Sequence, residues 1–216
     1  MNVVCNKCEK YGLVFRATNI LPVNYIEGNP NSKIWIIGLN PKGAIGNVES
    51  RTLSEFEILD PDCHSYFKDF KKVSSALYSN WKSEKSTIAH TDLIKCFSPS
   101  FPPIVKIDNI DKQVKIDVII KNCKDHLRLQ LINGRPKVVI CNGSQVCEEI
   151  LKLFPPQNIE EWHKLTSYSA SINLDNNIEH KFRIVLSGYI GRIDDRNKRR
   201  LGLEIEQIIK EEGIEL

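Results

Sequence analysis

The turn after the apolar run at residues 33–38 presents one amide side chain on a stiffened backbone. It reads Gly38-Leu39-Asn40-Pro41-Lys42-Gly43. Open α/β sheets bind their ligands at the carboxyl ends of strands, where a turn of this kind begins. Gly38 and Gly43 allow close approach to the backbone because they lack a Cβ atom, and Pro41 holds Asn40 extended. The turn is therefore a candidate for positioning a reactant, and an ordinary βα turn is the alternative.

Cysteine spacing indicates a second site, of the metal-binding type. The chain has seven cysteines, and Cys5 and Cys8 form a C-x-x-C pair outside any βαβ pattern. This placement argues against a thioredoxin-like redox pair and favours a metal or iron–sulfur site. Stable disulfides are not expected in a reducing compartment.

Composition permits nucleic-acid binding without requiring it. The 216-residue chain has a formal charge of +3, and the basic side chains crowd one segment, at Arg192, Arg196, Lys198, Arg199 and Arg200. A solvated helix start is the alternative reading of that segment. No apolar run approaches the roughly 20 residues that span a bilayer, and the N-terminus lacks signal-peptide features. We expect a cytoplasmic, nucleoid-associated prokaryotic protein.

Strand-like and helix-like segments alternate along the chain. Apolar runs predict strands at 33–38, 87–94, 136–141 and 182–186. Helices are predicted between and after them, at 65–81, 111–133, 144–153 and 195–211. Residues 95–103 are too rich in proline for regular structure, and 154–180 form an excursion. The alternation predicts a single α/β domain over residues 1–216, with a parallel sheet between helical layers and an N-terminal Cys-x-x-Cys segment at 1–32.

Several motifs occur in an order that resembles a known family. Glu27-Gly28-Asn29-Pro30 precedes the first predicted strand, the second ends in Thr91-Asp92-Leu93-Ile94-Lys95-Cys96, and the third lies in the segment 135–143. This succession resembles the uracil-DNA glycosylase superfamily, especially its iron–sulfur branch from thermophilic bacteria and archaea. The resemblance runs from Cys5 to about Leu153 and weakens over residues 44–85 and after residue 154.

The resemblance implies a three-layer α/β/α fold with a central four-stranded parallel sheet. It implies a DNA glycosylase that flips a deaminated or damaged base and hydrolyses its N-glycosidic bond in base-excision repair. DNA is the expected partner, and we expect a monomer without a membrane partner or nucleotide cofactor. Two alternatives stay open: a weak or inactive DNA-binding protein of the same fold, and an iron–sulfur redox sensor that binds DNA.

The same resemblance assigns four cysteines to a 4Fe–4S cluster. Cys5, Cys8, Cys96 and Cys123 occupy the ligand places of the iron–sulfur branch. The gap between Cys96 and Cys123 is longer than that branch usually shows. Zinc is the alternative metal, and simple buried thiols are a third interpretation. The other cysteines, Cys63, Cys141 and Cys147, match no ligand place and are expected to be core thiols.

Asn40 and Asp92 are the implied catalytic residues. In branches with Asn-Pro in this turn, the Asn orients the attacking water, whereas the iron–sulfur branch more often has Glu-Ala-Pro. Gly38, Leu39, Pro41, Lys42 and Gly43 would line the base site. Asp92 stands where the family usually has the Asn that reads uracil. An ionised Asp only accepts hydrogen bonds, so the preferred base could carry an exocyclic amine. A protonated Asp92 would mimic Asn, and a backbone-capping role is the alternative.

The segment after the fourth predicted strand departs from the family pattern. The family has His-Pro-Ser there, and its His stabilises the departing base, but no His follows residue 186 in this chain. Ser187 and Gly188 could instead grip a phosphate, Tyr189 or Ile190 could wedge into DNA, and Arg192 could compensate electrostatically.

The remaining aromatic and histidine residues have less specific assignments. Tyr66 or Phe67 could stack on the flipped base, with core packing as the alternative. His90 is expected to be a satisfied core histidine and His126 a surface residue. His64 precedes the helix that carries Tyr66.

Overall fold

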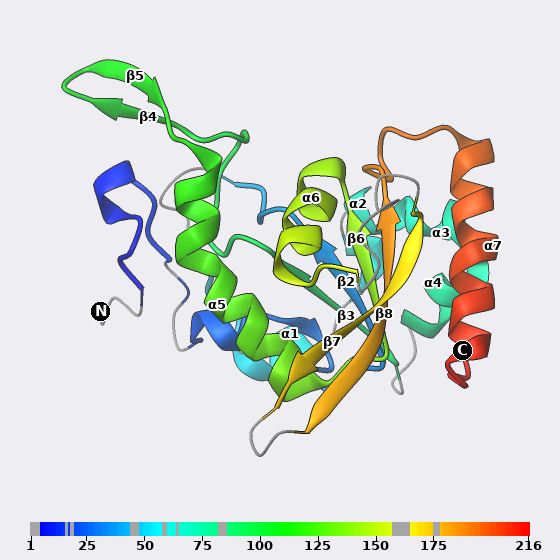
Figure 1. Ribbon diagram of the computed structural model, residues 1–216. Helices are drawn as coiled ribbons and strands as arrows, with labels where there is room; N and C mark the ends of the chain where they lie inside the picture. The colour runs from blue at the N-terminus through cyan, green and yellow to red at the C-terminus, as the bar shows by residue number, and fades with distance from the viewer. Residues whose placement is uncertain are drawn as a thin grey trace.

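A six-stranded mixed sheet forms the centre of the molecule (Figure 1). The computed structural model describes residues 5–15, 17, 20–43, 48–57, 60–63, 65–81, 86–156, 165–174 and 178–216, so His64 lies outside the described residues. The spatial order is β1 (Glu27–Gly28), β3 (Ile88–Asp92), β2 (Ile34–Gly38), β6 (Val138–Asn142), β8 (Glu179–Ser187) and β7 (Ser167–Asn173).

The four predicted strands form the parallel centre of this sheet. β3, β2, β6 and β8 pair in parallel, with Gly38 opposite Asp92 in the register of β2 and β3. The expectation of only four strands is corrected, because β1 and β7 add antiparallel edges. β7 falls within the predicted excursion. Its buried residues alternate with Ser and Asn, so it lacks the continuous apolar run that marks the central strands.

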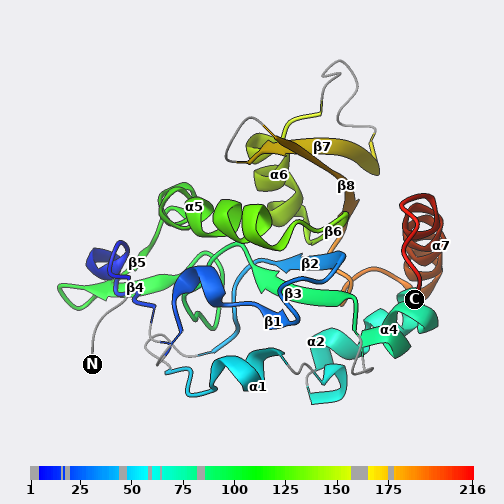
Figure 2. The ribbon, with the colours of Figure 1, turned by 90° about the horizontal axis from the view of Figure 1, so that it is seen from below.

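Helices cover both faces of the sheet, which confirms the α/β/α layering (Figure 2). α5 (Ile116–Gly134) and α6 (Ser144–Leu153) pack on the face to which Trp35 and Ile37 point. α2 (Ser65–Lys68), α3 (Phe70–Val73), α4 (Ser75–Trp81) and α7 (Asp195–Glu211) pack on the face of Ile34 and Ile36. The short α1 (Leu53–Glu57) contacts β1. Within the described ranges, no helix is long and apolar enough to cross a membrane.

The helix predicted at 65–81 is three short helices instead of one. Ser74 has an extended backbone that ends α3, and its hydroxyl oxygen accepts a hydrogen bond from Leu77 N at 3.1 Å, which caps the start of α4. Serine competes with helical hydrogen bonding in this way because its side chain bonds to nearby backbone. The predicted apolar face is nevertheless buried, at Phe67, Phe70, Val73, Leu77 and Trp81.

A hairpin replaces the predicted start of the helix at residue 111. β4 (Ile104–Ile107) and β5 (Ile110–Gln113) pair antiparallel and project from the body of the fold (Figure 1). Asp108 and Asn109 both have positive φ, as the tight turn of a two-residue hairpin requires. The Asp-Asn pair was therefore the sequence signal for a hairpin at this place.

α7 packs so closely on α3 that one position has no room for a side chain. A Cβ atom at Gly202 would overlap the Val73 carbonyl oxygen and lie 2.7 Å from its carbon. Beside this contact, buried Lys198 donates to Asp69 at 3.0 Å. Lys198 is thus an anchor for α7 and is not part of an exposed basic surface.

We expect Gly202→Ala to destabilise the protein by about 1–3 kcal/mol, because the added methyl group would separate α7 from α3. Urea denaturation followed by circular dichroism measures the change. Leu203→Ala is the matched control, since Leu203 is 69% exposed and its truncation should change stability by less than about 0.5 kcal/mol. Equal stability of the two variants would contradict the close packing.

Candidate active site

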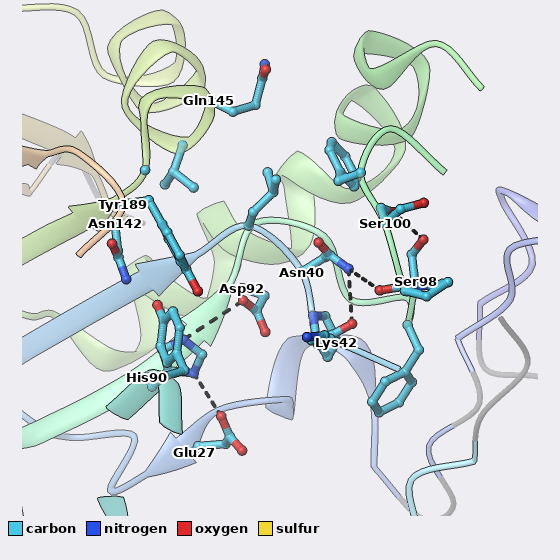
Figure 3. A pocket seen from close by; sticks show the side chains of 18 of the residues that line it. Glu27, Asn40, Lys42, His90, Asp92, Ser98, Ser100, Asn142, Gln145 and Tyr189 are labelled. Atoms are coloured by element: carbon cyan, nitrogen blue, oxygen red, sulfur yellow. Dashed lines mark hydrogen bonds and ion pairs between the residues drawn. The ribbon is translucent and has the colours of Figure 1, made fainter. Parts of the chain in front are cut away.

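A pocket of about 780 Å³ lies at the carboxyl ends of the parallel strands. The turns after β2, β6 and β8 and the loop after β3 contribute to its wall. Figure 3 shows the polar side chains that converge on it from these segments. The volume falls in the range of sites that enclose a small ligand.

Most predicted site residues line this pocket. They are Leu39, Asn40, Pro41, Lys42, Tyr66, Phe67, Asp92, Tyr189 and Arg192. Gly38, Gly43, Ser187 and Gly188 are not among the lining residues. The prediction missed several others that do line it, chiefly Glu27, His90, Ser98, Asn142 and Gln145.

Asn40 is held by the loop that follows β3. Its Nδ2 donates to the carbonyl oxygens of Pro41 at 3.0 Å and Ser98 at 3.3 Å. Gly43 N donates to the same Ser98 carbonyl oxygen, and Ser98 N donates to Pro41 O, so the turn and the loop are joined. Among the described residues nothing donates to Asn40 Oδ1. The backbone thus fixes the orientation of the amide and leaves its oxygen available to a ligand.

A row of charged groups crosses the floor of the pocket (Figure 3). His90 Nδ1 lies 2.8 Å from Glu27 Oε2, and His90 Nε2 lies 3.9 Å from Asp92 Oδ1. Arg51 donates to Glu27 Oε1 at 3.0 Å from the other side. His90 and Asp92 are both 5% exposed. The expectation of a satisfied core histidine is therefore wrong in part, because His90 is buried but faces the pocket and its Nε2 has no hydrogen-bond partner within the described part of the chain.

The sequence contained a signal for this row. His90 and Asp92 are two positions apart in a strand, and side chains with that spacing point to the same face. Glu27 could not be placed in the same way, because it reaches His90 only through the antiparallel pairing of β1 with β3, where Glu27 is opposite His90.

Burial and neighbouring charges set the ionisation of these groups. Burial alone would lower the pKa of His90, but the Asp92 and Glu27 carboxylates outweigh it and raise that pKa. Burial raises the pKa of Asp92 to about 6, with Glu27 adding to the shift and His90 and Lys95 opposing it. Burial would raise the pKa of Glu27 too, but His90 and Arg51 lower it overall. The two neighbouring carboxylates therefore favour the protonated form of His90.

The buried Lys95 holds the backbone of Asp92 in place. Its Nζ is buried and donates to Thr91 Oγ1 at 2.7 Å, to Gln130 Oε1 at 2.8 Å and to the backbone oxygen of Asp92. Burial lowers the pKa of Lys95 to about 8. The end of β3 is thus fixed by side-chain hydrogen bonds as well as by the sheet.

Aromatic rings form one wall of the pocket. The rings of Tyr66 and Tyr189 are 6.2 Å apart at 36°, and Tyr66 lies 5.4 Å from the His90 ring. Phe67 lines the pocket but is 95% buried between Trp81 and His90, which fits the core-packing alternative. Tyr189 is 42% exposed, whereas Ile190 is 1% exposed and belongs to the core. Tyr189 is thus the one of the two proposed wedge residues that can reach a ligand.

The turns after β6 and β8 are fastened to each other. Ile190 N donates to Asn142 Oδ1 at 2.9 Å, and Ser187 Oγ donates to Cys141 O at 2.9 Å. Ser187 is buried, so its hydroxyl serves the protein backbone. The expected phosphate contact of Ser187 and Gly188 stays a prediction. Beyond this turn, Arg192, Arg196, Arg199 and Arg200 are exposed at and near the start of α7.

The four cysteines of the expected metal site gather beside α5. Cys8, Cys96 and Cys123 are buried and Cys5 is partly buried. Burial raises the pKa of Cys96 and Cys123, the latter to about 11, and the neighbouring cysteines add to both shifts. Cys5 Sγ also lies 3.9 Å from Nε2 of the half-buried His126. Four neighbouring thiols are donors that suit a soft metal. As placed in this structure, no three His, Cys, Asp or Glu side chains among the described residues are grouped to hold an ion, so the metal stays a prediction.

Comparison with known families gives one match. The model of the uracil DNA glycosylase superfamily matches residues 25–187, which include β1 to β8 and the pocket-lining turns after β2 and β6, but not the turn after β8. No curated protein matches the chain.

We expect Asp92→Asn to stabilise the protein increasingly as pH rises. Asp92 ionises near its usual pKa of 3.8 in the unfolded chain but near 6 in the folded protein. Folding is therefore penalised as pH rises from about 4 to about 6, and the penalty reaches about 3 kcal/mol above that range. The neutral amide removes it.

Urea denaturation of the wild type and Asp92→Asn at pH 4 and pH 7.5 tests this expectation. Asp111→Asn is the matched control, because Asp111 is exposed on β5. If the stability of Asp92→Asn differed from that of the wild type by the same amount at both pH values, the raised pKa of the buried Asp92 carboxylate would be contradicted.

Proposed function

The chain belongs to the uracil-DNA glycosylase superfamily, and on that premise we propose that it removes a deaminated base from DNA by hydrolysing the N-glycosidic bond. The observation that carries this proposal is the geometry of Asn40. Its amide nitrogen is bound by two carbonyl oxygens, and its oxygen is left available at a pocket of the size of a small ligand.

Water positioning is the proposed role of Asn40. As the base leaves with the bonding electrons, positive charge develops on the sugar, and water attacks the anomeric carbon. An amide cannot act as a general base at neutral pH, but its oxygen can accept a hydrogen bond from the water and aim it. Correct placement of a nucleophile is a large part of catalysis when the electrophile is already reactive.

The pocket wall supports base flipping. Tyr66 and Tyr189 offer aromatic faces for the extruded base, and base stacking on such rings is worth about 1–3 kcal/mol. Lys42 and the exposed Arg192 carry positive charge at the pocket. These charges favour contact with the DNA backbone, and such contacts make binding sensitive to salt.

We expect Asn40→Ala to release base about 100-fold more slowly than the wild type, because the water loses its positioning group. Duplex oligonucleotides containing uracil, hypoxanthine or xanthine are the substrates, and alkali cleavage of the abasic sites reports product. Asn133→Ala is the matched control, since Asn133 is exposed near the C-terminal end of α5.

Two results would contradict the proposal. If Asn40→Ala released base as fast as Asn133→Ala, Asn40 would have no role in the reaction. Binding of DNA by the wild type without release of any of the three bases would favour a DNA-binding protein of the same fold.

We further propose that Cys5, Cys8, Cys96 and Cys123 hold a metal group, a 4Fe–4S cluster in first place and zinc as the alternative. The gathering of four thiols from the N-terminal segment, the loop after β3 and α5 supports this proposal. When bound, the group would tie these three segments together. The base-release step described above uses none of these cysteines.

Protein purified without oxygen should contain iron and sulfide, or zinc, and Cys96→Ser should lose most of it because one of four ligands is removed. Metal and sulfide analysis, with a visible absorption spectrum, measures this. Cys147→Ser is the matched control, as Cys147 lies on α6 and donates to Ser187 O. Wild-type protein free of both metals would contradict the proposed site.

A further inference from the structure

His90 lines the pocket, and its Nε2 is a buried polar atom without a hydrogen-bond partner in the described part of the chain. A buried polar group left unpaired costs free energy, so a partner supplied by a ligand would be favourable. Asp92 Oδ1, at 3.9 Å, is too far to be that partner.

The neighbours of His90 determine whether Nε2 carries a proton and can donate a hydrogen bond. Nδ1 lies 2.8 Å from the Glu27 carboxylate, which only accepts hydrogen bonds, so Nδ1 must carry a proton. The charged or titratable groups around the pair are Glu27, Arg51, Lys95, Tyr25 and Tyr66. With Glu27 on one side and Asp92 on the other, a second proton on the ring is favoured, and Nε2 becomes a donor.

We propose that His90 and Asp92 together read the Watson–Crick edge of the flipped base, with His90 Nε2–H donating to a base carbonyl oxygen and Asp92 accepting from the adjacent ring N–H. Resting on the proposed glycosylase function, this inference names the substrate as a base with a lactam edge, such as uracil or hypoxanthine. A single Asn amide offers the same donor and acceptor. Here two side chains supply them.

The pair also fits the electronic demand of the reaction. A lactam base departs with negative charge spread onto its carbonyl oxygens, and a cationic donor placed at such an oxygen stabilises that charge more in the transition state than in the substrate. No histidine follows β8 in this chain, so His90 supplies positive charge from a different strand. An exocyclic amine in the same place would face the imidazolium donor and be repelled.

Replacement of His90 tests the inference. We expect His90→Leu to release uracil about 10- to 100-fold more slowly, because a charged hydrogen bond is lost. His90→Gln should show the same loss while remaining folded, since its amide nitrogen can still donate to Glu27 and only its oxygen would face the base. His180→Gln is the matched control, because His180 Nε2 bonds to Pro136 O outside the pocket.

Rescue distinguishes base reading from a structural role. Adding Asp92→Asn to His90→Leu should restore uracil release, since the amide brings its own donor and acceptor. In equilibrium binding, both His90 variants should bind a 2′-fluoro-deoxyuridine oligonucleotide, which resists cleavage, more weakly than the wild type does. They should bind an abasic-site oligonucleotide as well as the wild type, because that ligand has no base to read.

The outcomes separate this inference from the proposed function. If the wild type releases uracil and the His90 variants match His180→Gln, the inference is overturned and the glycosylase function stands. Faster release of cytosine or adenine than of uracil or hypoxanthine by the wild type would also overturn it. If the wild type releases no base at all, the proposed function fails and the inference falls with it.

Discussion

The absence of a side chain at Gly38 is the constraint on which the site depends. The register of β2 and β3 sets Gly38 opposite Asp92. A Cβ atom at residue 38 would collide with Asp92 Oδ1 and would lie 3.0 Å from His90 Nε2 and 3.2 Å from Tyr66 Oη. Three polar atoms from two elements therefore converge on the space that a side chain would fill. Gly38, the last residue of β2, therefore leaves the room in which these polar groups form the pocket floor.

This arrangement places charge where it is costly. Glu27, His90 and Asp92 lie in a row with little exposure, and taking such charges out of water is unfavourable unless they are paired. Arg51 and Lys95 compensate from outside the row, and Lys95 also fixes the backbone of Asp92. Perturbed ionisation of this kind concentrates at functional sites. The sheet and the buried Lys95 hold these charged groups in place. The free-energy cost of burying them lowers the stability of the folded protein, and the pocket remains charged.

Sequence patterns predicted the parts of the molecule that depend on local periodicity. The four apolar runs, the turn at Asn40 and the placement of Asp92 at the end of a central strand all agree with the structure. β7 was missed because its buried residues alternate with polar ones and its pairing with β8 is visible only in the folded chain. The β4–β5 hairpin was missed because β5 is exposed, and the Asp108-Asn109 turn was its one local signal. Glu27 was missed as a site residue for the same reason, since it meets His90 only through pairing between strands distant in sequence. Lys198 was wrongly grouped with an exposed basic segment. It is buried and donates a hydrogen bond to Asp69, a residue distant in sequence, so its role is to anchor α7.

Detection of the free base is the most direct test of the central claim that this pocket cleaves an N-glycosidic bond. Duplex DNA with one uracil is incubated with the wild-type protein, and the small-molecule fraction is analysed by mass spectrometry. The account predicts free uracil in an amount equal to the abasic sites that remain in an otherwise intact strand. Bound DNA with no free base, or cleavage of the strand with the base still attached to its sugar, would contradict it.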